Sequence, residues 1–380
     1  MRVAIDATPL LGVRAGIGHY VAGLVTALDS FADGPEVVLT AFTWQGADGL
    51  ASWVTARRAV AHRRAPVRLL QQAWLRGPLP PVEWLCGPVD VFHGTNFVLP
   101  PTRRAAGVVT VHDLAYLDHP DTVTPATLRY RRLVPAGLRR AGGVCTPSRA
   151  VADRIVEVYG VDPGRVFVTP NGLGPRWLAG PSRPSPEWLL ARGLPERYAL
   201  FVGTVEPRKN VPVLLEAYRR LLARGERPPA LVVAGAPGWD PAAATVDLPA
   251  DTVVVTGYLT EDDLVTVTAG ASCLVLPSRA EGFGLPPLQA FACGVPVVVS
   301  DLPVFREVLG PFATYVPPGD GDALAAAVAA AVRDDGGEAA RRARQAYARR
   351  HTWQRCAAET LRAYRTAAGQ AEIEAEVETR

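Results

Sequence analysis

Short apolar runs recur along the chain, each bounded by Gly, Pro, Asp or Ser and followed by a stretch with helical spacing. Runs such as LVVAG and PVVVS are continuously apolar, a pattern typical of parallel strands covered on both faces. Strands that alternate with helices predict doubly wound α/β sheets. We expect strands at Val3–Ala7, Val37–Phe42, Val89–His93, Val108–His112, Gly143–Thr146, Val166–Thr169, Ala199–Gly203, Leu231–Gly235, Thr252–Thr256, Cys273–Leu276, Pro296–Ser300 and Thr314–Val316.

A break divides this pattern into two halves. Residues 173–197 are rich in Gly, Pro and Ser and contain no strand-like run, which predicts a linker. Two α/β domains joined in this way are expected to enclose a cleft, because ligands of open α/β sheets bind at the carboxyl ends of the strands. The predicted parts are an N-terminal domain at 1–175, a linker at 176–196, a C-terminal domain at 197–352, a helix at 353–368 that packs back on the N-terminal domain, and a frayed tail at 369–380.

Composition narrows the class of protein. A chain of 380 residues is longer than one hydrophobic core usually grows, and 48% hydrophobic with 20% charged residues is ordinary for a folded protein. A net charge of +3 is too small to indicate a nucleic-acid partner. Five scattered cysteines without a CxxC pair argue against a disulfide framework or zinc site and favour a reducing cytoplasm. The sequence also lacks a signal-peptide pattern and any uninterrupted apolar run of 18 residues.

Lys209 is the one lysine among 40 basic residues. A GC-rich coding bias accounts for the excess of arginine. On composition alone, chance retention explains Lys209 as well as a functional requirement does. Its context favours function, because Gly203 ends a predicted strand and Arg208 and Lys209 precede an amphipathic helix in FVGTVEPRKNVPVLLEAY. Two cations near a helix N-terminus oppose the helix dipole unless an anion lies nearby. This arrangement favours a diphosphate site over solvated surface charge.

Glycines mark a weaker candidate near the start of the chain. Gly16 and Gly18 lie in LLGVRAGIGHY, just before a helical pattern at Tyr20–Leu28, where backbone N–H groups can approach a phosphate. The spacing matches neither GxGxxG nor the phosphate loop, and a plain tight turn is the alternative.

A histidine follows a strand in the run VHD. At this position His112, with Asp113 beside it, can bond a sugar hydroxyl or stabilise developing charge. A buried, hydrogen-bonded histidine is the alternative interpretation, and the same ambiguity applies to His93 in FHGTN.

The segment PSRAEGFGLPPLQAFACGVPVVVSD carries the strongest pattern in the second half. Glu281 precedes the turn Gly282-Phe283-Gly284, and a helix predicted from about Pro286 to Gly294 places Gln289 about one turn inside it. A carboxylate beside backbone donors can hold sugar hydroxyls, and a polar group eight residues later can reach a ribose. A capped helix between two strands requires similar residues, which is the alternative.

In combination, GTVEPRKN, EGFGLPPLQA, AGIGHY and VHD resemble the retaining glycosyltransferase family 4, and the resemblance runs from Met1 to about Tyr364. It implies a GT-B fold, in which two Rossmann-like domains face a central cleft. It also implies that the N-terminal domain binds the acceptor and the C-terminal domain binds a nucleotide sugar.

The resemblance implies roles for individual residues. Lys209 is expected at the donor diphosphate with Arg208 beside it, Glu281 at the transferred sugar, Gly16 at the distal phosphate and His112 near the reacting centre. The other expected donor-side positions are Gly18, Phe283, Gly284 and Leu285, with Asn171 of TPNG and Asp113 as additional positions at the cleft.

The sequence departs from the family at Gln289. The family hallmark is a Glu, seven residues and a second Glu that holds the ribose hydroxyls, but here the second position is an amide. An amide oxygen accepts a hydrogen bond without the strength of a carboxylate, so we expect nucleotide contacts that are weakened or altered by about 1 kcal/mol, with activity retained. Alternatives to an active transferase are a non-catalytic nucleotide-sugar binding paralogue and a GT-B epimerase or phosphorylase.

The resemblance also implies a mechanism. The acceptor attacks the front face of the sugar through an oxocarbenium-like state, and the protein stabilises the leaving diphosphate with cations and needs no metal or other cofactor. The GDGD string at Gly319–Asp322 is expected to cap a helix at Ala323–Val332 and not to bind metal. GDP-mannose is the first expected donor, followed by UDP and dTDP sugars.

Two long stretches of the first half contain arginines and no acid, and in the second of them apolar residues are interleaved with the arginines. These stretches are residues 49–82 and 122–152. Such faces can dock on anionic lipid at the inner face of a membrane or on a phosphorylated acceptor, and solvated helix faces are the alternative. The expected acceptor is a small molecule, glycolipid or glycan.

Overall fold

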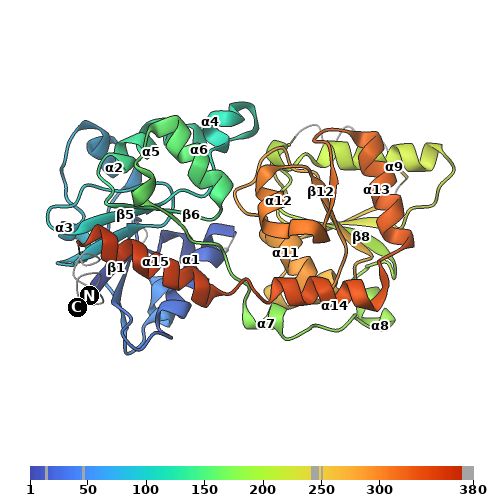
Figure 1. Ribbon diagram of the computed structural model, residues 1–380, viewed down its shortest axis with the longest axis horizontal. Helices are drawn as coiled ribbons and strands as arrows, with labels where there is room; N and C mark the ends of the chain where they lie inside the picture. Colours follow the sequence, from blue (N-terminus) through green and yellow to red (C-terminus); the bar gives the residue numbers. More distant parts are fainter. Residues whose placement is uncertain (13–15, 45–47, 241–247, 250, 370–380) are drawn as a thin grey trace, which may run out of the picture. The chain divides into compact units, whose positions relative to one another are not determined.

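The computed structural model describes residues 1–12, 16–44, 48–240, 248–249 and 251–369. These residues divide into two compact units (Figure 1). Among the described residues, the first unit contains Met1–Leu117, Thr124–Gly172 and the chain from Thr352 to Gly369, and the second contains Asp118–Val123 and Leu173–His351. The predicted frayed tail lies outside the described residues apart from Gly369. The chain therefore leaves the first unit, builds the second and returns to the first.

The first unit is built on a parallel sheet of seven strands in the order β3-β2-β1-β4-β5-β6-β7. Continuous apolar runs become strands buried on both faces, as in β1, where Val3, Ala4 and Ile5 have no exposed surface. The strands are β1 (Arg2–Asp6), β2 (Glu36–Thr40), β3 (Arg58–Val60), β4 (Val91–Gly94), β5 (Ala106–Thr110), β6 (Gly143–Thr146) and β7 (Val166–Val168).

Helices cover both faces of this sheet, with α1 and α15 on one side and α2, α5 and α6 on the other (Figure 1). Close packing of α1 on α15 requires Gly23, since a Cβ at that position would overlap the ring of Trp353. The elements are η1 (Thr8–Leu10), α1 (Gly16–Leu28), η2 (Asp48–Trp53), α2 (Val67–Arg76), α3 (Glu83–Cys86), α4 (Ala115–Asp118), η4 (Thr127–Arg129), α5 (Tyr130–Leu138), α6 (Arg149–Tyr159), η5 (Pro163–Arg165) and α15 (Trp353–Ala367).

The second unit has a parallel sheet of six strands in the order β10-β9-β8-β11-β12-β13. Its central strands are the most apolar and the most buried, and the edge strand β10 is only half-buried. The strands are β8 (Tyr198–Val202), β9 (Ala230–Ala234), β10 (Val253–Gly257), β11 (Cys273–Leu276), β12 (Val297–Ser300) and β13 (Thr314–Val316).

Helices α9 and α13 pack together in this unit, as do α11 and α14. Asp320 caps α13 by accepting hydrogen bonds from the N–H groups of Asp322 and Ala323, so the GDGD string is a helix cap as predicted. The elements are η3 (Pro120–Thr122), α7 (Pro175–Leu178), α8 (Pro186–Leu190), η6 (Pro207–Lys209), α9 (Val211–Ala223), α10 (Glu261–Gly270), α11 (Leu285–Ala292), α12 (Pro303–Leu309), η8 (Gly310–Phe312), α13 (Gly321–Arg333) and α14 (Gly337–Ala348).

The structure differs from the sequence-based expectation in several places. Strand β3 was not predicted. Residues 176–196, predicted as a linker, contain most of α7 and all of α8 and cluster with the second unit, as does Asp118–Val123 from within the predicted N-terminal domain. Helix α1 begins at Gly16 and not at Tyr20. None of the helices among the described residues is long and apolar enough to cross a membrane.

Candidate active site

In the second unit, the ends of β8 and β9 approach each other closely, and the chain after β8 carries the predicted cations Arg208 and Lys209. Gly203 follows β8 with φ of +149°, and Gly235 follows β9 with φ of +150°, conformations that side chains rarely adopt. A Cβ on Gly235 would overlap the carbonyl oxygen of Gly203. Lys209 lies close to this turn, with its Cε 3.6 Å from the place a Cβ on Gly203 would take, an ordinary van der Waals distance. These glycines therefore fix the turn that leads into η6.

Lys209 and Glu281, predicted from separate motifs, are in direct contact. Lys209 Nζ donates to Glu281 Oε1 over 2.6 Å, and the Ser278 hydroxyl donates to the same oxygen over 2.7 Å. Arg208 Nη1 donates to Glu281 Oε2 over 3.2 Å. The Glu281 and Lys209 side chains are only 7% and 12% exposed. The pair is thus a largely buried, charge-assisted contact.

These cations decide the protonation state of Glu281. Burial opposes ionisation of the carboxyl group, but the charges of Lys209 and Arg208 outweigh it and lower the pKa of Glu281 to about 2. Glu281 is therefore an anion at any physiological pH. It can accept hydrogen bonds from hydroxyl groups, but it has no proton to give.

The turn after Glu281 leads directly into α11. Gly284 has φ of +91°, and a Cβ there would lie 2.6 Å from the Phe305 ring, so this position requires glycine. The Phe283 ring is buried and packs edge-on to His351 with centroids 6.3 Å apart, which makes it part of the core. Leu285 is the first residue of α11, and Gln289 is a half-buried residue within that helix.

In the first unit, the predicted glycines lie inside the first turn of α1. Gly16 is exposed, whereas Gly18 is buried. The prediction that both glycines precede the helix is wrong, because α1 starts at Gly16. Their backbone N–H groups belong to the helix N-terminus, where such groups lack partners within the helix.

His112 lies just beyond β5 in a neutral form. Its Nε2 lies 2.8 Å from the Thr95 carbonyl oxygen, which can only accept, so Nε2 carries the hydrogen and Nδ1 the lone pair. Burial lowers the pKa of His112, against the opposing effects of the Thr95 carbonyl and Asp113. Tyr20 packs edge-on to the imidazole at 5.0 Å between centroids. The Asp113 carboxylate accepts from Ala115 N–H at the start of α4.

Two polar residues at the same edge of this sheet were missed by sequence reasoning. Asp6 ends β1, is 7% exposed and accepts from the hydroxyl of Thr8 over 2.6 Å. Burial raises the pKa of Asp6, although the hydrogen bonds from Thr8 act against this. The Thr95 hydroxyl donates to the Asp6 carbonyl oxygen over 2.6 Å, which ties the ends of β1 and β4 together. A polar residue directly after an apolar run, as in VAID, was the available signal.

His93 and Asn171 are placed differently from His112. His93 is fully buried, with Nδ1 2.7 Å from the Tyr364 hydroxyl and Nε2 2.7 Å from the Thr110 hydroxyl. Burial and the neighbouring His112 lower the pKa of His93 to about 3, so it is a neutral core residue that joins β4 to α15. Asn171 Oδ1 is buried and has no hydrogen-bond partner among the described residues.

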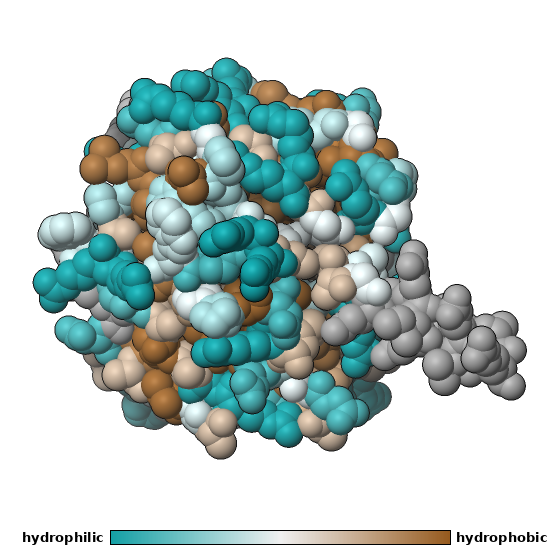
Figure 2. All heavy atoms as spheres, turned by 90° about the vertical axis from the view of Figure 1, so that its left-hand side faces the viewer, coloured by the Kyte–Doolittle hydropathy of each residue, from teal (hydrophilic) through white to brown (hydrophobic). Residues whose placement is uncertain are grey.

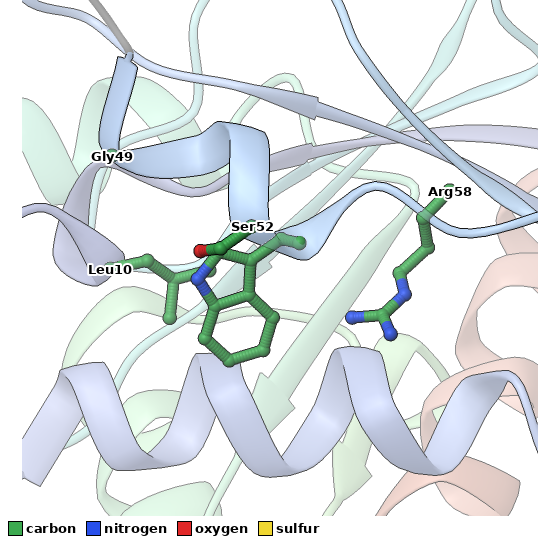
Figure 3. Close-up of a pocket in the computed structure, with 5 residues that line it drawn as sticks. Leu10, Gly49, Ser52 and Arg58 are labelled. Carbon is green, nitrogen blue, oxygen red and sulfur yellow. The ribbon is translucent and has the colours of Figure 1, made fainter.

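A separate cavity of about 440 Å³ lies in the first unit (Figure 3). Its described lining residues include none of the predicted site positions; they are Leu10, Gly49, Ser52, Trp53 and Arg58. Arg58 is already paired with Asp29 over 2.9 Å. Elsewhere in the described part of the chain, no cluster of three His, Cys, Asp or Glu side chains is arranged to hold a metal ion.

Two family profiles match the chain. Glycosyltransferase Family 4 matches residues 14–176, and Glycosyl transferases group 1 matches residues 190–351. The O-antigen chain mannosyltransferase B of Escherichia coli is 30% identical over 282 residues, which cover 72% of this chain and 74% of that protein. The O-antigen chain mannosyltransferase RfbU of Salmonella typhimurium is 30% identical over 234 residues, 60% of each chain.

Solved structures share the architecture at low sequence identity. Sucrose-phosphate synthase from Thermosynechococcus elongatus has a TM-score of 0.69 at 20% identity, covering 96% of this chain and 98% of that one. Anabaena HepE, solved in complex with UDP and glucose, has a TM-score of 0.67 at 17% identity, covering 95% and 99%. Together with the two parallel sheets, these matches define the class of protein, a glycosyltransferase with the GT-B fold. The chain belongs to glycosyltransferase family 4, within the glycosyl transferases group 1.

Proposed function

We propose that the chain is a retaining, metal-independent hexosyltransferase that uses a nucleotide diphosphate sugar. The observation that carries the proposal is the contact of Lys209 with Glu281 beside the N-terminal end of α9. An ammonium group has three N–H donors, and one is directed at Glu281, so the same nitrogen can also donate to a diphosphate. The anionic Glu281 can then accept from hydroxyl groups of the sugar.

His112, in the first unit, is a second proposed sugar contact, a role that the family resemblance implies. Because Nε2 donates to the Thr95 carbonyl oxygen, the lone pair on Nδ1 is the remaining polar site of the imidazole. A neutral nitrogen of this kind can accept from a sugar hydroxyl without placing a second positive charge at a developing oxocarbenium ion. The lowered pKa of His112 favours this neutral form at pH 7.

The proposed reaction is a front-face substitution. The bond from the anomeric carbon to the phosphate oxygen breaks with its electron pair, the acceptor oxygen bonds to the same face of that carbon, and the acceptor proton passes to the leaving phosphate. With a pKa of about 2, Glu281 is poorly suited to carry that proton. Lys209 then serves to stabilise the departing diphosphate.

Mannose from GDP-mannose is the proposed first choice of donor, supported by the mannosyltransferase names of the relatives in Escherichia coli and Salmonella typhimurium. UDP and dTDP sugars follow; the HepE structure was solved with UDP. A thermal-shift panel of GDP, UDP, dTDP and ADP, then of their sugars, tests the choice because a ligand of the folded state raises Tm. Stabilisation by GDP-mannose above the others is expected, and a preference for another base would overturn this donor.

Metal independence has its own test. Because Lys209 can supply positive charge to the leaving diphosphate, we propose that no divalent ion is required to stabilise it. Activity is expected to persist in excess EDTA. Loss of activity that only an added metal restores would contradict this part of the proposal.

Gln289 motivates the competing candidate, a protein that binds nucleotide sugars without transferring them. Incubation with the donor alone separates the candidates: slow hydrolysis supports transfer, an epimer of the donor sugar supports an epimerase, and an unchanged donor supports a binding protein. If Gln289 makes the protein inactive as a transferase, Gln289→Glu should create transfer activity where none existed. We expect an active protein that Gln289→Glu improves through tighter nucleotide binding.

We propose that the acceptor is a glycan. We also propose that the protein associates peripherally with an anionic membrane surface. The face of the first unit that carries α2 and α3 mixes hydrophilic and hydrophobic residues (Figure 2). Leu69, Leu79 and Trp84 are 64%, 59% and 53% exposed there. Exposed arginines of the same stretch are Arg63, Arg64, Arg68 and Arg76.

Glu83, the first acid after these arginines in the sequence, is engaged by the backbone of a later loop. Glu83 Oε1 accepts from the backbone N–H groups of Arg103, Arg104 and Ala105, which keeps this carboxylate on the protein side. Exposed apolar side chains with surrounding arginines fit an anionic lipid surface. Sedimentation with phosphatidylglycerol vesicles at low salt tests this, with phosphatidylcholine vesicles as the control. No binding to either would end the membrane proposal.

A further inference from the structure

Arg208 lies between two carboxylates. Its Nη2 donates to Glu206 Oε1 over 2.6 Å, and its Nη1 donates to Glu281 Oε2 over 3.2 Å. Nη1 also donates to the Ala280 carbonyl oxygen over 2.9 Å. Both terminal nitrogens of the guanidinium are therefore engaged by the protein itself. The Arg208, Glu206 and Glu281 side chains are only 17%, 14% and 7% exposed, so solvent screens these contacts little.

The main chain reinforces this arrangement. The Arg208 carbonyl oxygen accepts from Arg279 N–H over 2.8 Å, so η6 and the loop that carries Glu281 are joined by backbone as well as by side chains. These two segments lie about seventy residues apart in the sequence. Arg208 thus acts as the bridge between the turn after β8 and the loop after β11.

The two oxygens of Glu281 are held by different cations. Oε1 accepts from Lys209 and Ser278, and Oε2 accepts from Arg208. A carboxylate held at both oxygens keeps one rotational orientation, and hydrogen bonds to a ligand depend steeply on such orientation. Removing the contact to Oε2 frees the group to rotate while Lys209 still neutralises its charge.

Glu206 makes Arg208 a poor ligand for a diphosphate. A carboxylate 2.6 Å from the guanidinium matches its charge and would repel an approaching phosphate. Lys209 has no such second acid among its ion pairs in the described part of the chain, since its contact is with Glu281. The acids around Arg208 and Lys209 therefore indicate different roles for these two neighbouring cations.

We propose that Arg208 and Glu206 are positioning residues that orient Glu281 toward the transferred sugar, while Lys209 supplies the charge that binds the diphosphate. This inference rests on the proposed function, and it gives Arg208 a role other than the donor contact expected from the sequence. Donor recognition then divides into a phosphate part at Lys209 and a sugar part at the Glu206–Arg208–Glu281 chain.

Calorimetric binding of GDP and of GDP-mannose separates the two parts. Arg208→Gln and Glu206→Gln should each weaken GDP-mannose about tenfold or more while changing GDP affinity less than about threefold, because the sugar contact alone is disturbed. Lys209→Gln should weaken both ligands. Arg208→Lys serves as a second variant in case the glutamine form does not fold, and should show the same selective loss because one ammonium cannot bridge both carboxylates.

Glu206→Gln is the most informative of these variants. If Arg208 bound phosphate directly, removal of the neighbouring acid would tighten GDP and GDP-mannose alike. If Arg208 is a positioning residue, Glu206→Gln should weaken GDP-mannose binding even though Glu206 is not proposed to contact the donor. Equal loss of GDP in Arg208→Gln and Lys209→Gln would overturn the proposal.

A ligand-free measurement keeps this inference distinct from the proposed function. In a double-mutant cycle, Arg208→Gln and Glu281→Gln should each lower Tm, and the double variant should lower it by less than the sum. Additive shifts would contradict the bridge whatever the donor. If the wild-type chain binds none of GDP, UDP, dTDP, ADP and their sugars, the proposed function fails while the cycle still decides whether Arg208 holds Glu281.

Discussion

Lys209 Nζ lies 2.6 Å from Glu281 Oε1, although 72 positions separate the two residues in the sequence. The contact brings the one lysine of the chain to the acid that precedes α11. It unites the two motifs that pointed separately to a sugar-nucleotide site.

Replacing Lys209 should disable transfer. Lys209→Ala removes the cation proposed for the diphosphate and leaves Arg208 as the cation beside Glu281, so kcat/KM should fall about 100-fold or more. Lys209→Arg should retain part of the activity, since the charge remains but the shape does not. Arg333→Ala, which removes a side chain that is 70% exposed, is the matched control and should behave as wild type. Near-normal turnover by Lys209→Ala would refute the assignment.

Glu281→Gln should lower stability in a pH-dependent manner. The folded-state pKa of about 2 lies below the ordinary value of 4.5, so the ionised group stabilises the fold fully above about pH 4.5 and loses this effect as pH falls toward 2. The shift corresponds to roughly 3 kcal/mol at neutral pH. Denaturant unfolding at pH 7 and pH 3 measures it. The gap between wild type and variant should narrow at the lower pH, and a constant gap would contradict the charge-based account.

Gly235→Ala should destabilise the second unit. The added Cβ would overlap the Gly203 carbonyl oxygen, and φ of +150° is strained for alanine, so a loss of about 2 kcal/mol or more is expected in unfolding experiments. Gly77→Ala is the control, because no atom lies within 4 Å of the new Cβ and the backbone there is extended. Equal effects of the two changes would argue against a close approach of the β8 and β9 ends.

Tyr364→Phe should weaken the attachment of α15 to the first sheet. The change deletes the hydroxyl 2.7 Å from His93 Nδ1 and leaves a buried nitrogen without its partner, at a cost of about 1–3 kcal/mol. Affinity for GDP should stay unchanged, since Tyr364 is fully buried and its hydroxyl contacts the core residue His93. Chemical denaturation and calorimetry of the same samples check both statements, and a variant as stable as wild type would remove the structural role of this contact.

The sheets could be predicted from the sequence because continuous apolar runs have few alternatives to buried parallel strands. Strand β3 escaped detection because Arg58–Val60 is short, half-exposed and begins with an arginine. The start of α1 was set too late because Gly16 and Gly18 are poor helix formers. The packing of α1 on the sheet and on α15 outweighs the low helix propensity of these two glycines.

The candidate site was only partly predictable. Motif and spacing indicated Lys209, Glu281 and His112 as separate functional positions. The contact of Arg208 with Glu206 spans two residues, but its contact with Glu281 depends on how η6 meets a loop about seventy residues later, and no local pattern encodes that meeting. Asp6 was missed for a related reason, because one acid at a strand end carries little information until its burial is known.

The most direct test of the central claim is a donor-only reaction followed by NMR. Wild-type protein incubated with GDP-mannose should slowly release GDP and mannose, the first-formed mannose should keep the anomeric configuration of the donor, and Lys209→Ala should abolish the release while Arg333→Ala leaves it unchanged. Release of the inverted anomer, formation of an epimer, or undiminished hydrolysis by Lys209→Ala would contradict the account.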